Sequence, residues 1–160
     1  NPGQDIVVAL PNERVESSAD ETLLYPLPAV FPVTSGFGMR VHPISGLASF
    51  HQGIDLGAPT GTPILAAYSG QVIASGHAGG YGKAVVLAHD DSRRTRYAHM
   101  SEIQVSEGDW VSQGDVIGLV GSTGNSTGPH LHFEFWQRNE QSEWIALDIS
   151  ERLQLAIAQR

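Results

Sequence analysis

The segment running from His130 to Phe135, His-Leu-His-Phe-Glu-Phe, alternates strictly between polar and apolar side chains. On a β-strand, this alternation puts His130, His132 and Glu134 on one face and the apolar side chains on the other. The apolar face belongs in a core, so the two imidazoles and the carboxylate line the opposite face. Imidazole is the commonest zinc ligand, although a pair of this kind on its own is more often an ordinary polar strand face.

A second pair of potential ligands lies in the segment His51-Gln-Gly-Ile-Asp55. Gly53, Gly57 and Pro59 argue against a helix here, and in an extended segment His51 and Asp55 share a face with only Gly53 between them. Combined with one histidine of the His-Leu-His strand, this pair supplies three nitrogen and oxygen ligands and leaves a fourth position open. That arrangement is typical of catalytic rather than structural zinc.

Such a site predicts metal-assisted hydrolysis. Zinc held by two neutral imidazoles and a carboxylate lowers the pKa of a water from about 15.7 toward 7 and polarises a carbonyl group. A side chain must take the proton from the water and pass it to the leaving amine. The helical H-E-x-x-H motif is absent, so the candidates are the spare imidazole of the His-Leu-His strand and His99, in Tyr97-Ala-His99. Glu134, Tyr97 and Arg40 are further candidates for supporting the ligands or lining the substrate groove.

The remaining histidines are less informative. His42 and His89 have turn-like surroundings, which favours a structural role, and His77 lies in a glycine-rich loop with no role assigned. We expect the walls of the substrate groove to come from the loops at 42–50, 76–82 and 122–129.

Short apolar stretches separated by glycine-rich turns run from Ala29 to about Trp136 and must position these residues. The stretches of strand length lie at 62–66, 70–74, 83–88, 109–111 and 115–120. Their spacing is typical of an all-β sandwich or barrel, so we predict a small, mainly antiparallel β fold. At the C-terminus, Asp148 and Glu151 fit a capping box, which predicts a short helix over 148–160. Four apolar residues share one face of this helix: Ile149, Leu153, Ala156 and Ile157.

Composition excludes several classes of protein. The chain has 160 residues with 17 acidic against 9 basic side chains, a formal net charge of −8, and no cysteine. This balance argues against binding to nucleic acid or to an anionic membrane surface, and the absence of cysteine excludes disulfides and thiolate zinc sites. No apolar run reaches the length of about 20 residues that a membrane span needs.

The N-terminal region differs from the rest of the chain. Residues 1–28 are acidic and contain four prolines, so we predict a linker or arm before a domain at 29–147. The sequence begins at Asn1 without an initiator methionine, and we expect it to be a processed piece whose targeting segment is missing.

Five motifs together resemble the lysostaphin/LytM-type zinc metallopeptidases, in the order and spacing of that family, from about Phe31 to Trp136. These motifs are Ser35–Pro43, His51–Asp55, Ala58–Pro63, Thr95–Ser101 and Ser126–Glu134.

The resemblance implies residue roles and a fold. It implies that His51, Asp55 and His132 bind one zinc ion and that His99 and His130 act in catalysis. It also implies a small antiparallel fold related to the barrel-sandwich hybrid domains, in agreement with the strand pattern.

The function that the resemblance implies is that of an endopeptidase. It would cut the peptide cross-links or stem peptides of bacterial peptidoglycan, act outside the cytoplasm and, we expect, be a monomer. The alternative within the family is a catalytically silent activator of a cell-wall amidase. Members of that kind have lost zinc ligands, whereas all five positions are intact here. A swinging-arm carrier is a third hypothesis, because residues 107–117 resemble a lipoyl-domain hairpin. The only lysine, Lys83, lies outside that hairpin, which argues against a carrier.

Overall fold

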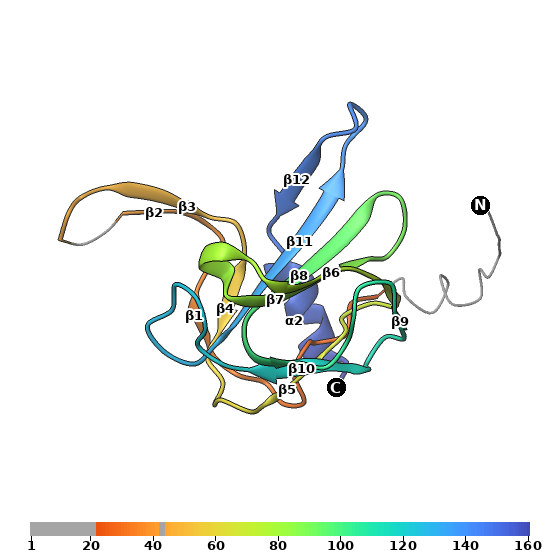
Figure 1. Cartoon of the computed structure of the whole chain (residues 1–160). Coiled ribbons are helices and arrows are strands. Elements are labelled where there is room, and N and C mark those ends of the chain that lie inside the picture. The colour runs from red at the N-terminus through yellow and green to blue at the C-terminus, as the bar shows by residue number, and fades with distance from the viewer. Residues whose placement is uncertain (1–21, 42–43) are drawn as a thin grey trace.

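The computed structural model describes residues 22–41 and 44–160, which form short antiparallel strands and one C-terminal α-helix (Figure 1). The strands are β1 (Val33–Ser35), β2 (Gly38–Val41), β3 (Ala48–His51), β4 (Ile54–Leu56), β5 (Pro63–Leu65), β6 (Gly70–His77), β7 (Lys83–Ala88), β8 (Arg93–Ile103), β9 (Trp110–Val111), β10 (Val116–Val120), β11 (Leu131–Arg138) and β12 (Trp144–Leu147). A 3-10 turn, η1 (Gly79–Tyr81), precedes β7, and the helix is α2 (Ser150–Ala158).

Ten strands of the described residues form one sheet, in which β1, β4, β11, β8, β7, β6 and β9 are neighbours in that order. β10 pairs with β5 and β8, and β12 pairs with β11. β2 and β3 form a separate hairpin that projects from the body of the molecule (Figure 1). The prediction of a mainly antiparallel β fold with a C-terminal helix is confirmed, although the described strands do not close into a barrel.

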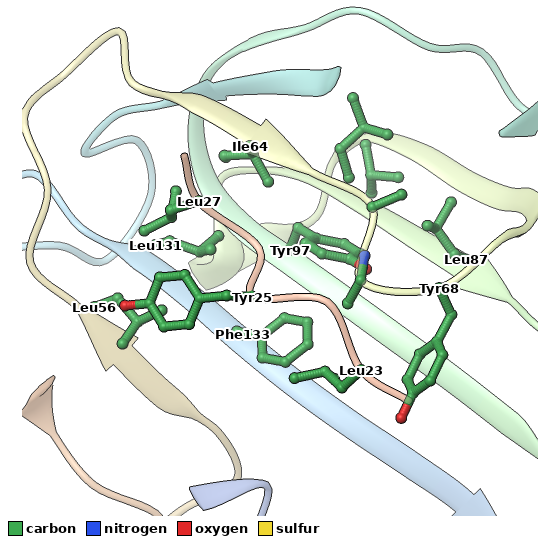
Figure 2. Close-up of a cluster of buried hydrophobic side chains, with 14 of the residues drawn as sticks. Leu23, Tyr25, Leu27, Leu56, Ile64, Tyr68, Leu87, Tyr97, Leu131 and Phe133 are labelled. Carbon is green, nitrogen blue, oxygen red and sulfur yellow. The ribbon is translucent and has the colours of Figure 1, made fainter. Parts of the chain in front are cut away.

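Strand β11 lies near the middle of the sheet and shows the predicted alternation. Leu131, Phe133 and Phe135 are buried in the core, where Phe133 packs on Tyr97 with the ring centroids 5.3 Å apart. Figure 2 shows this part of the core, with side chains from several strands converging. Because the apolar residues of β11 are fixed on the core side, the intervening His132 and Glu134 must face the other side of the sheet.

The boundary predicted at residue 28 is wrong for the part that the structure describes. Leu23, Tyr25 and Leu27 are buried in the core and are labelled in Figure 2. Backbone bonds hold this segment in place, from Leu24 N to the carbonyl of Ala67 at 3.0 Å and from Leu65 N to the carbonyl of Pro26 at 2.8 Å. The packed unit therefore includes residues from Leu23 onward, and the rest of the predicted arm, residues 1–21, lies outside the described residues.

The C-terminal helix packs on the core as predicted, but without the predicted capping box. Leu153 and Ala156 are buried, as is Ile149, which occupies the N-cap position. Asp148 accepts a hydrogen bond from the backbone of Ser150 at 2.9 Å and therefore caps a local turn before the helix. The helix begins one residue too late for Asp148 to be its N-cap, so apolar packing rather than capping stabilises it.

Replacing Phe133 by alanine is expected to lower the free energy of unfolding by about 3 to 5 kcal/mol, because a large, fully buried side chain is lost from a packed core. The matched control is Phe50→Ala, since Phe50 is 53% exposed in the β2–β3 hairpin and contacts Phe37 only edge-on. We expect it to cost at most about 1.5 kcal/mol. Urea denaturation with a chelator present measures both, and equal losses would contradict this assignment of the core.

Candidate active site

Three strands bring His51, Asp55 and His132 together. His51 ends β3, Asp55 is the middle residue of β4, and Asp55 lies directly opposite His132 in the antiparallel β4–β11 pair. Gly53 permits the close approach, because a Cβ atom there would lie 2.5 Å from the carbonyl oxygen of Phe133 and 2.9 Å from the ring of His132. The absence of a side chain at this position is therefore a requirement of the site.

One ligand atom from each of these residues points to a common position. The Nδ1 of His132 lies 2.8 Å from Oδ1 of Asp55 and 3.2 Å from Nε2 of His51. The Nε2 of His51 lies 3.4 Å from the same carboxylate oxygen. A tetrahedral zinc ion with ligand distances of about 2.0 to 2.1 Å holds its ligand atoms about 3.3 Å apart. The spacing of the three atoms fits such an ion.

The opposite nitrogen of each imidazole is occupied by a hydrogen-bond acceptor. Nδ1 of His51 donates to the carbonyl of Gly36 at 2.8 Å, and Nε2 of His132 donates to Oε2 of Glu134 at 2.7 Å. When the rings are neutral, these bonds place the proton on the outer nitrogen and leave a lone pair on the nitrogen that faces the common position. The chemistry of the donor set therefore also fits a cation.

The electrostatics of the cluster favour positive charge at the same point. Burial alone would raise the pKa of Asp55, but hydrogen bonding and charge interaction with His132 outweigh it and hold this pKa below its usual value. Burial alone would lower the pKa of His132, but hydrogen bonds to Asp55 and Glu134 raise it to about 9. A metal ion bound here would take the place of the proton on Nδ1 of His132.

His99 and His130 lie beside this cluster, with ring centroids 4.8 Å apart. Nδ1 of His99 donates to the carbonyl of Thr123 at 2.7 Å, and Nδ1 of His130 donates to that of Gly128 at 2.8 Å. In the neutral rings, Nε2 therefore carries the lone pair, and Nε2 of His130 lies 3.7 Å from Oδ1 of Asp55. Burial lowers the pKa of His99, which favours the neutral ring at pH 7.

A cavity of about 930 Å³ opens onto all five of these residues. Two of the predicted loops form part of its wall. The loop at 76–82 contributes Gly80 and Tyr81, and the loop at 122–129 contributes residues 124–129. Arg40, a predicted groove residue, also lines this cavity from β2. In the third predicted loop, at 42–50, residues 44–50 do not line the cavity. His42 lies outside the described residues.

Glu134 is 1% exposed and is held by four donors. Besides Nε2 of His132, these are the hydroxyl of Tyr81 at 2.9 Å, a guanidinium nitrogen of Arg96 at 3.0 Å and Nε1 of Trp136 at 2.7 Å. Burial alone would raise the pKa of Glu134, but the bonds to His132 and Trp136 lower it, so the carboxylate stays ionised. Sequence reasoning identified Glu134 and missed its other three partners. Only Trp136 had a visible signal, its position two residues along the same strand.

Tyr97 does not lie in the groove, contrary to the sequence-based expectation. It is fully buried, and its hydroxyl accepts a hydrogen bond from the backbone of Ala67 at 3.0 Å and one from Thr95 Oγ1 at 2.8 Å. In a regular strand Tyr97 and His99 would share one face, but His99 has a left-handed backbone with φ of 62°. This local conformation breaks the alternation and separates the two rings.

His77 and His89, the other histidines that the structure describes, do not line the cavity. His77 is exposed at the end of β6. Nδ1 of His89 lies 2.8 Å from the carbonyl of Ser69 and Nε2 lies 2.7 Å from Thr95 Oγ1, which agrees with a structural role. Among the described residues, no helix is both long and apolar enough to cross a membrane.

Comparison with known proteins places this arrangement among metallopeptidases. The chain is 50% identical over 102 residues to the DD-carboxypeptidase/endopeptidase Mpg of Neisseria meningitidis serogroup B, covering 64% of this chain and 24% of that protein. It is 37% identical over 127 residues to the peptidoglycan DD-endopeptidase ShyB of Vibrio cholerae, covering 78% and 30%. The chain thus spans about a quarter to a third of the length of these relatives.

A solved structure shares both the fold and the sequence similarity. The catalytic domain of the antimicrobial peptidase lysostaphin from Staphylococcus simulans superposes with a TM-score of 0.68 at 34% identity, covering 78% of this chain and 92% of that one. A zinc-containing peptidase from Vibrio cholerae gives a TM-score of 0.73 at 35% identity, covering 83% and 40%. The sequence pattern of peptidase family M23 matches residues 49–144, which include the whole cluster of five. The chain therefore belongs to peptidase family M23, the metallopeptidases that include lysostaphin.

Proposed function

We propose that this chain is a zinc-dependent endopeptidase that hydrolyses peptide cross-links or stem peptides of bacterial peptidoglycan. The observation that carries the proposal is the convergence of His51 Nε2, Asp55 Oδ1 and His132 Nδ1 on one point, within a cavity that also contains two further imidazoles. The names of the relatives, peptidoglycan DD-endopeptidases among them, support the substrate class.

In this proposal, His51, Asp55 and His132 hold one zinc ion per chain. Zinc in such a site lowers the pKa of a water molecule and polarises the carbonyl of the scissile peptide. The chain supplies the proton transfers, for which two imidazoles with free Nε2 atoms are present. The carbonyls of Thr123 and Gly128 hold the rings of His99 and His130 in the tautomer that accepts a proton at Nε2 and later donates it to the leaving amine.

The proposed setting follows from the substrate. Peptidoglycan lies outside the cytoplasm, so we propose an extracytoplasmic location. We also propose that the enzyme is a monomer. We propose that the catalytic domain spans the predicted range 29–147 together with the packed segment from Leu23.

The direct test uses purified protein, one equivalent of zinc and purified peptidoglycan, with the soluble products identified by mass spectrometry. New peptide termini that disappear on adding chelator would support the endopeptidase. If peptidoglycan remains uncut while zinc is bound one to one, the endopeptidase proposal is wrong and the amidase-activator hypothesis takes its place.

Replacing Glu134 by glutamine is expected to weaken zinc binding by about 10- to 100-fold, the usual loss when the partner of a ligand histidine is altered. The amide can still accept the proton of His132 Nε2, but it lacks the charge that makes the imidazole a stronger ligand. Glu102→Gln is the matched control, because Glu102 is exposed on the neighbouring strand β8. Competition with a chromogenic chelator measures both affinities, and equal affinities would show that Glu134 does not support the ligand.

A further inference from the structure

A second, smaller hollow lies on the same face of the sheet as the five-residue cluster. Its volume is about 240 Å³, and its lining residues are Gln52, Val86, Arg94, Arg96, Trp136 and Trp144. It shares no lining residue with the larger cavity. Arg96 lies between the two, since its guanidinium bonds to Glu134 and lies 4.4 Å from the centre of the Tyr81 ring at the edge of the larger cavity.

The strand register places this hollow in line with the active site. Along β11, His132, Glu134, Trp136 and Arg138 project from the same face at every second position. Trp136 lies opposite Arg94 of β8, four residues from His132, which corresponds to about 13 Å along the strand. A peptide that extends from the scissile bond along β11 would therefore pass over this hollow.

Of the three arginines at this hollow, Arg96 is paired with Glu134, whereas Arg94 and Arg138 have no balancing carboxylate among the described residues. The guanidinium of Arg94 lies 4.1 Å from the centre of the Trp144 ring, and that of Arg138 lies 5.2 Å from the same ring. Within residues 22–41 and 44–160, no carboxylate forms an ion pair with either arginine. By contrast, the adjacent Arg93 points to the other face and pairs with Asp90 at 2.9 Å. This is a local excess of positive charge on a chain with a net charge of −8.

One polar atom of this hollow lacks the partner that it needs. The Nε of Arg94 is buried and makes no hydrogen bond to any part of the chain that the structure describes. A buried N–H of a charged group without an acceptor destabilises the arrangement that contains it. A carboxylate is the group that matches the donor fork of a guanidinium, and it would reach Nε of Arg94 once this side chain turns toward the hollow.

We propose that this hollow is a substrate subsite that binds a free carboxylate of the peptidoglycan stem peptide through Arg94, with Arg138 adding attraction at longer range. The inference rests on the proposed function, because it takes the substrate to be a peptide with free side-chain or α-carboxylates. An extended peptide advances about 3.3 to 3.6 Å per residue, so the recognised carboxylate lies about four residues from the scissile bond. Stem peptides contain γ-linked glutamate and diamino acids, whose free carboxylates can occupy such a position.

The test compares two synthetic stem-peptide substrates that differ only in a carboxylate or a carboxamide about four residues from the scissile bond. The wild type is expected to show a KM about 10-fold or more lower for the carboxylate form, the usual scale of a charge-assisted hydrogen bond. Arg94→Gln should lose this preference, with an unchanged KM for the carboxamide and an unchanged zinc content. Arg93→Gln is the matched control and should keep the preference, because Arg93 projects from the opposite face.

Calorimetry with metal-free protein separates this inference from the proposed function. If metal-free wild type binds the carboxylate peptide more tightly and Arg94→Gln does not, the subsite is supported even where zinc-loaded protein cuts neither peptide. In that case the endopeptidase proposal alone would fail. If wild type binds and cleaves both peptides equally well, or if Arg93→Gln removes the preference as fully as Arg94→Gln, the subsite is overturned.

Discussion

Replacing His132 by alanine is expected to abolish both zinc binding and peptidoglycan cleavage. The change removes one of the three ligand atoms and leaves Asp55 without the imidazole 2.8 Å from its carboxylate. It also removes the bond from Nε2 of His132 to the buried carboxylate of Glu134, which keeps its bonds to Tyr81, Arg96 and Trp136. Two ligands from separate strands do not retain zinc against a competing chelator.

The measurements are the zinc content after gel filtration and the release of soluble muropeptides. His77→Ala is the matched control, since His77 is exposed and does not line the cavity, and it should keep both zinc and activity. Circular dichroism and the urea midpoint establish that the His132→Ala chain is folded without zinc. If His132→Ala still binds one zinc ion while His130→Ala binds none, the roles of these two histidines must be exchanged.

The local pattern of β11 predicted much of the site, because strand alternation alone fixes which side chains share a face. Leu131 and Phe133 are core residues, and His132 and Glu134 lie together on the other face. The spacing of His51 and Asp55 indicated a second pair of potential ligands, which pointed to a metal site only together with the His-Leu-His segment. The glycine between them marked the close approach that β11 makes at this point.

The errors arose where local pattern competes with tertiary contacts. Leu23, Tyr25 and Leu27 alternate as buried strand residues do, but the acidic residues and prolines around them made the whole segment read as an arm. At His99, a positive φ breaks the side-chain alternation within β8, and the sequence pattern contains no information about such a residue. The pairing of Glu134 with Arg96 depends on the register between β11 and β8, whose sequences are 38 residues apart at this point.

The second large effect is expected at His130, where alanine should leave zinc binding intact and lower kcat by about 100-fold or more. His130 is expected to spare the metal because all three proposed ligand atoms come from other residues. The loss of rate follows from the loss of an imidazole whose Nε2 faces the cavity and whose tautomer is fixed by the carbonyl of Gly128. The same reasoning applies to His99, which the carbonyl of Thr123 holds in the same way.

The two proton-transfer variants can be distinguished from a damaged metal site by measuring zinc affinity and kcat on the same preparations. His130→Ala and His99→Ala should both bind one zinc ion with nearly wild-type affinity but have a low kcat. The Glu134→Gln variant should show the opposite pattern, with a weaker zinc affinity and, at saturating zinc, a kcat near that of the wild type. In that variant, added zinc restores most of the rate, because its proton-transfer groups are intact. In the histidine variants, added zinc restores nothing, because the missing group is the one that carries the proton to the leaving amine. A full recovery of either histidine variant by zinc would assign that residue to metal binding instead of catalysis.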